Sequence, residues 1–176
     1  DWSQIQNKYN EYSWIMNNLN NPCEELRNKF ISFYKVNLGI RDTKDRRKFF
    51  TLLTSCIENN IDDYSYVLKK LSIITGRNEL SFASKIVATV NPQMPVIDKI
   101  ILGHLKLNRP IYGDIKHRIS KSILIHKDIK KQYNDFLNTT EGKKLIKTFN
   151  SRIKKKSSFE ITDIKKLDFL LWQTRK

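Results

Sequence analysis

The sequence predicts an all-α fold, an orthogonal multi-helix bundle of about eight helices. Glycine and proline are scarce, with 5 and 4 among 176 residues. Between them, apolar residues recur at the three- and four-residue spacing of amphipathic helices. No segment sustains the alternation of a β-strand, and no internal repeat is present. The length suits one domain over residues 1–176 with a sizeable core.

The first four helices are predicted from apolar stripes and from the residues that begin and end them. The first stripe runs from Trp2 to Leu19, and the second begins at Pro22 and ends at Gly39. The third is capped by Asp42 or Thr43 and stops at Asn59 and Asn60. The fourth begins at Asp62 or Asp63 and ends at Gly76.

The next segment differs because residues 79–90 are small or apolar on most faces, which is typical of a buried helix. The run Asn91-Pro-Gln-Met-Pro95 breaks this helix, since a residue before proline is disfavoured in the helical region. Another helical pattern follows over residues 99–107. Asp98 stands at the position of its N-cap.

The last third is predicted to form three charged helices, over residues 114–138, 140–153 and 162–174. The formal net charge of the chain is +15. From Lys106 onward, 19 lysines and arginines stand against 7 acidic residues, so most of the excess lies in the basic helices from about residue 112. A field of this sign favours nucleic acid as a partner, with duplex DNA foremost. A solvated basic surface remains the alternative.

Several classes of protein are not favoured. The three histidines have no metal-ligand spacing, and there is no glycine-rich phosphate loop, so we expect no metal and no cofactor. Cys23 and Cys56 have no CxxC partner, and a buried free thiol is favoured over a disulfide. No apolar run approaches the ~20 residues that span a bilayer, and no signal-peptide pattern opens the chain. We therefore expect a cytoplasmic protein that does not enter membranes.

Residues 73–107 resemble the centre of the helix-hairpin-helix DNA glycosylase superfamily. In that family a helix rich in small apolar residues is followed by a loop and an apolar pair that ends in the catalytic aspartate, which begins the next helix. Val96-Ile97-Asp98 matches this pattern, and residues 73–80 would occupy the hairpin. The resemblance implies a DNA-repair fold, a DNA partner and Asp98 as the catalytic carboxylate.

The departures from the family pattern concern the hairpin and the nucleophile. The hairpin Thr75-Gly-Arg-Asn-Glu79 has one glycine where the family usually has two. Phosphate contacts from Gly76, Arg77 and Asn78 are nevertheless expected. Bifunctional members place a lysine near the position of residues 79–81, which hold none here. Lys85 comes a turn later, where we expect it to point elsewhere, so the resemblance implies a monofunctional glycosylase. The other candidate nucleic-acid contacts are Lys85, Lys99, Lys154, Lys155 and Lys156.

An aspartate suits the base-excision reaction that the resemblance implies. Cleavage of an N-glycosidic bond develops positive charge on the sugar, which a fixed carboxylate stabilises. The extruded base requires a pocket with aromatic or apolar walls. The candidates for those walls are Trp2, Trp14, Phe49, Phe50 and Tyr64, whereas Trp172 is expected in the core.

Three interpretations stay open at this point. The chain can be a monofunctional base-excision enzyme, a non-catalytic DNA- or RNA-binding module on the same fold, or a helical protein that binds an acidic protein partner. Asp98 can equally be a plain N-cap, worth ~1 kcal/mol to its helix.

Overall fold

The computed structural model is all-helical, as the sequence predicts, and it describes residues 1–21, 23–36, 43–154 and 159–173. Nine helices and no strand occur in these ranges. They are α1 (Trp2–Asn17), α2 (Glu24–Tyr34), α3 (Thr43–Glu58), α4 (Tyr64–Thr75), α5 (Leu80–Val90), α6 (Lys99–His104), α7 (Ile115–Asn138), α8 (Thr140–Arg152) and α9 (Asp163–Gln173). No described helix is long and apolar enough to cross a membrane.

Several predicted caps are confirmed. The carboxylates of Asp63 and Asp98 accept hydrogen bonds from backbone amides in the first turns of α4 and α6. Gly76 ends α4 in the left-handed region, with φ of 67°. Asn60 also has a positive φ, 51°, just after α3. Residue 42, a candidate cap of α3, lies outside the described ranges.

Two helices are shorter than predicted. α2 ends at Tyr34, because Lys35 adopts a left-handed φ of 54°, and the predicted stop at Gly39 lies outside the described residues. α6 ends at His104 and not at residue 107, because Lys106 also has a φ of 54°. A left-handed residue cannot continue a right-handed helix, and neither stop carries the glycine that would have indicated it.

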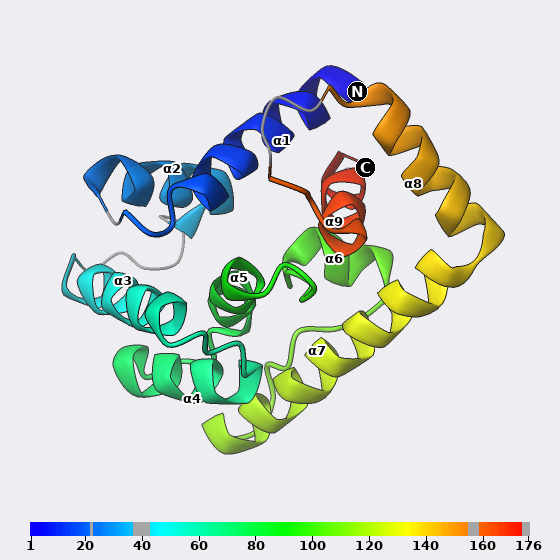
Figure 1. Cartoon of the computed structure of the whole chain (residues 1–176). Coiled ribbons are helices and arrows are strands. Elements are labelled where there is room, and N and C mark those ends of the chain that lie inside the picture. The colour runs from blue at the N-terminus through cyan, green and yellow to red at the C-terminus, as the bar shows by residue number, and fades with distance from the viewer. Residues whose placement is uncertain (22, 37–42, 155–158, 174–176) are drawn as a thin grey trace.

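The arrangement has α5 at the centre of one group of helices and α9 at the centre of another (Figure 1). α5 contacts α3, α4 and α7, whereas α9 contacts α1, α6, α7 and α8. One connected hydrophobic core runs through both groups, and its residues come from all of these helices. The rings of Tyr12 in α1 and Phe169 in α9 pack edge to face at 5.7 Å, which joins the first helix to the last.

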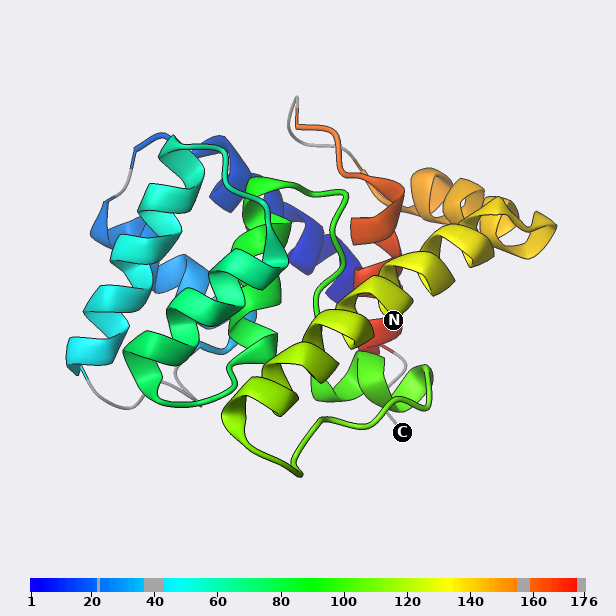
Figure 2. The same ribbon diagram turned by 90° about the horizontal axis from the view of Figure 1, so that it is seen from below.

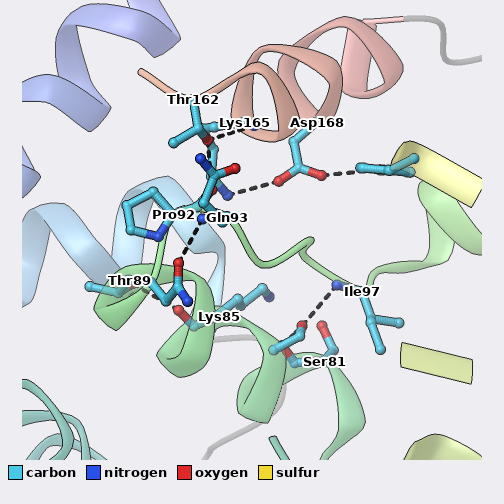
Figure 3. A network of polar contacts seen from close by, with 12 residues as sticks. Ser81, Lys85, Thr89, Pro92, Gln93, Ile97, Thr162, Lys165 and Asp168 are labelled. Carbon is cyan, nitrogen blue, oxygen red and sulfur yellow. Dashed lines mark hydrogen bonds and ion pairs between the residues drawn. The ribbon is translucent and has the colours of Figure 1, made fainter. Parts of the chain in front are cut away.

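The core also contains an ion pair. Lys165 and Asp168 on α9 are both fully buried, and their Nζ and Oδ2 atoms are 2.7 Å apart. The hydroxyl of Tyr133 on α7 donates to the other carboxylate oxygen at 3.1 Å. Figure 3 shows this pair beside the loop that follows α5. A buried pair of this kind is satisfied only while both partners remain.

We expect Lys165→Met to lower the free energy of unfolding by about 3 kcal/mol, because it leaves the Asp168 carboxylate buried without its cation. The double variant Lys165→Met/Asp168→Leu should lie within about 1 kcal/mol of wild type, since it removes both charges. Urea unfolding followed by circular dichroism measures both values. A single variant as stable as wild type would contradict a structural role for the pair.

Candidate functional site

Asp98 lines a cleft with a volume of about 1270 Å³. Its Oδ1 atom accepts hydrogen bonds of 2.9 Å from the amides of both Ile100 and Ile101. Asp98 is therefore the N-cap of α6 and a lining residue of the cleft at the same time. The two amides fix the orientation of the carboxylate.

Three contacts position the loop that carries Asp98. The hydroxyl of Ser84 on α5 accepts a buried 2.8 Å hydrogen bond from the Ile97 amide, one residue before Asp98. At the other end of the loop, Thr162 donates to the carbonyl of Pro92 at 2.6 Å, and Asn91 donates to Asp62 at 2.6 Å. Figure 3 shows the contacts from α5 and α9 to this loop. Asp98 is thus held from both groups of helices.

The cleft lies between the two groups of helices and its charge is mainly positive. α3, the hairpin and α5 contribute residues from the first group, α1, α6 and α9 contribute from the second, and α2 adds Phe33 and Tyr34. The cationic lining residues are Lys8, Lys35, Arg77, Lys85, Lys99 and Arg109, and the acidic ones are Asp45, Glu79 and Asp98. Such a surface suits an anionic ligand longer than a single small molecule.

Lys85 lies in this cleft with Asp98, which corrects the expectation that it points elsewhere. It is only 7% exposed, and its Nζ donates to the carbonyl of Tyr34 at 2.7 Å. That carbonyl belongs to the last turn of α2, where no helical amide remains to bind it. Burial lowers the pKa of the Lys85 amine to about 8, while the negative charges of Asp98 and Glu79 oppose the shift.

Residues of the hairpin line the cleft, but many of their hydrogen-bond donors are already bonded to other groups of the protein. The Gly76 amide donates to Ser72, and the Arg77 amide donates to the Thr75 hydroxyl. Asn78 is buried, and its side-chain amide donates to Ser122 on α7 at 2.9 Å. A phosphate would have to compete with these bonds. The Arg77 side chain is more than half exposed and forms a 2.9 Å ion pair with Glu79.

The remaining lysines separate into two groups. Lys99 is exposed and lines the cleft beside Asp98. Lys154 lies elsewhere, because its backbone exchanges two hydrogen bonds with Gln6 on α1. Gln4 lines the cleft, and two residues along a helix is a turn of about 200°, so Gln6 faces away from it. Lys155 and Lys156 lie outside the described residues.

The aromatic walls of the cleft were not predicted. Within the described residues it is lined by Phe33, Tyr34, Phe82 and Trp172, and by none of Trp2, Trp14, Phe49, Phe50 and Tyr64. Phe49, Phe50 and Tyr64 are buried in the core instead. Trp172 packs on Phe33 and Phe169, as expected of a core residue, but one part of it also lines the cleft. Helical spacing identifies which face of a helix is apolar, not where that face meets an opening.

In the described part of the chain, the remaining histidine and cysteine side chains do not form a second candidate site. No group of three or more metal-ligating side chains occurs there. His126 stacks on Tyr64 with ring centroids 4.0 Å apart, and burial lowers its pKa to about 4, so it is a neutral core residue. Cys56 is buried and Cys23 is exposed, and both are free thiols.

No protein-family model matches the chain, and no curated protein or solved structure is significantly similar to it.

We expect the Lys85 amine to titrate near pH 8, as measured by NMR after reductive methylation with ¹³C-formaldehyde. Asp98→Asn should lower this pKa further, because it removes a negative charge that favours the ammonium form. Glu79→Gln should lower it by less, since Glu79 is the smaller of the two opposing charges. A Lys85 resonance that titrates near pH 10.5 in all three proteins would contradict this placement.

Proposed function

We propose that the chain binds duplex DNA in the cleft and excises a base there by a monofunctional glycosylase reaction, with Asp98 as its carboxylate. One observation carries the proposal: an oriented carboxylate stands at the wall of a large, mainly cationic cleft. A plain N-cap needs no cleft beside it. The all-helical fold and the position of Asp98 at the start of α6 agree with the resemblance over residues 73–107.

The parts of the cleft suit the steps of the reaction. Lys99, Arg77 and Arg109 offer cations to the phosphates on either side of an extruded nucleotide. Phe33, Phe82 and Trp172 offer apolar walls against which a base can stack. The Asp98 carboxylate then stabilises the positive charge that develops on the sugar as the glycosidic bond breaks, or activates the attacking water.

The proposal is tested by measuring duplex binding and abasic-site formation for wild type and Asp98→Asn over a salt series. Asparagine is also a good N-cap, so the variant should keep its fold and its affinity for DNA. We expect base release on a lesion panel to fall at least about 100-fold, as happens when an electrostatic stabiliser is removed. Asp63→Asn is the matched control, because Asp63 caps α4 in the same way.

The two other interpretations correspond to distinct outcomes. Duplex binding without abasic sites in any protein would favour a non-catalytic nucleic-acid-binding module. Absence of duplex binding at ~50 mM salt, where phosphate contacts are strong, would favour an acidic protein partner.

A second candidate function, which would replace the monofunctional reaction, is β-elimination at an abasic site by Lys85. With a pKa of about 8, about a tenth of its amine is neutral at pH 7. The neutral amine can attack the C1′ aldehyde of an abasic sugar, with loss of water, to form an imine. Water or the Asp98 carboxylate then takes a C2′ proton, the electron pair forms a C2′–C3′ double bond, and the C3′–O bond breaks so that the 3′ phosphate leaves. Hydrolysis of the remaining imine frees the Lys85 amine. The amine must first leave the Tyr34 carbonyl.

Borohydride reduces such an imine to a stable bond, so the activity can be trapped. If Lys85 is the nucleophile, wild type incubated with an abasic duplex and borohydride gives a covalent adduct, and Lys85→Gln gives none. Lys99→Gln, which changes an exposed lysine of the same cleft, should still give the adduct. Equal trapping by the Lys85 variant, once its circular dichroism shows a folded protein, would assign the adduct to another amine.

A further inference from the structure

The loop over residues 105–114, which joins α6 to α7, exposes two large apolar side chains at its tip. Ile111 is 63% exposed and Tyr112 is 83% exposed. Figure 2 shows this loop protruding at the lower edge of the view, below α6 and the first turn of α7. Adjacent exposed apolar side chains of this size are costly to hydrate and commonly mark a contact surface.

Several residues restrain the backbone of the loop, so the exposed tip has a defined conformation. Lys106 and Gly113 have positive φ values of 54° and 84°, and Pro110 fixes its own φ. A Cβ atom added at Gly113 would lie 2.8 Å from the His117 side chain, so both the φ and the packing require glycine. The Asp114 carboxylate caps α7 by accepting from the His117 amide at 2.7 Å.

The loop is attached to the cleft. The Arg109 guanidinium donates to the carbonyl of Asn78 in the hairpin, with a distance of 3.4 Å, and both residues line the cleft that contains Asp98. Ile111 and Tyr112 follow Arg109 by two and three residues. Tyr112 is therefore within about 10 Å, the length of three extended residues, of a residue that lines the cleft.

The chain on either side of the tip is basic. The flanking residues Lys106, Arg109, Lys116, Arg118 and Lys121 carry positive charge, and Asp114 is the one acidic residue between positions 106 and 121. An apolar tip inside a basic surface complements a duplex, whose bases are apolar on their faces and whose backbone is anionic. An acidic protein would also complement the charge and could pack on the ring, but it would not unstack the bases of a duplex, which is what the test measures.

We propose that Tyr112, supported by Ile111, inserts into the base stack of duplex DNA at the mouth of the cleft. The inference rests on the proposed function, because it assigns a residue to the opening of the duplex that base extrusion requires. Insertion of an apolar side chain between base steps unstacks them and kinks the duplex. The Tyr112 ring would then stack on a base of the duplex and oppose the return of the extruded nucleotide.

The test uses duplexes with 2-aminopurine beside the target base, because its fluorescence rises when its neighbours unstack. Wild type should bind and raise the fluorescence. Tyr112→Ala should bind about 5- to 160-fold more weakly, the range for loss of one base–aromatic stack, and should largely abolish the rise at saturating protein. Tyr112→Phe should behave as wild type, since it keeps the ring.

Tyr66→Ala is the matched control, because Tyr66 is also exposed, at 41%, but lies in the first turn of α4. It is separated by most of that helix, about 15 Å, from the hairpin. If Tyr112→Ala binds and raises the fluorescence as wild type does, the insertion is overturned while duplex binding in the cleft stands. If wild type does not bind duplex DNA, the proposed function fails and the insertion fails with it.

Discussion

The α5 helix is buried on almost every side, with nine of its eleven residues buried, and this constraint decides what its polar residues do. Polar groups that are removed from water need partners inside the protein. Ser84 finds one in the amide of Ile97, and Lys85 finds one in the carbonyl of Tyr34. The first bond positions the loop before Asp98, and the second holds the end of α2 against the cleft. Packing of one helix therefore determines two walls of the candidate site.

The sequence predicts the helices well because most of them depend on local signals. Apolar stripes at helical spacing, together with Asp63, Gly76 and Asp98 as caps, place α4, α5 and the start of α6 where the structure has them. Local signals do not predict that α2 and α6 end early, before the left-handed residues Lys35 and Lys106. Lysine has no intrinsic preference for a left-handed backbone, and tertiary contacts such as the bond from Lys85 to Tyr34 impose the end of α2.

The candidate site is predictable only in part, for a geometric reason. The cap, the break and the apolar pair around Asp98 occur together in the sequence, and their resemblance to the glycosylase pattern is what makes Asp98 a candidate. Lys85 was misplaced although four residues separate it from Ser81, a spacing that puts both on one face of α5, and both line the cleft. Lys8, Arg109 and Trp172 belong to segments far apart along the chain. No local pattern indicates that these segments meet at one opening.

The contact between the first and the last helix has a consequence for the synthesis of the chain. Tyr12 packs on Phe169, and Gln6 bonds to Lys154, so α1 finds its partners about 150 residues later. The N-terminal segment leaves the ribosome first, and α1 can pack on α2 at once, whereas its contacts with α9 form only after α9 has been made. The α3–α5 group can pack earlier, because its helices are consecutive. The cleft, which has residues of α1 and α9 in its lining, is therefore complete only once α9 has been made.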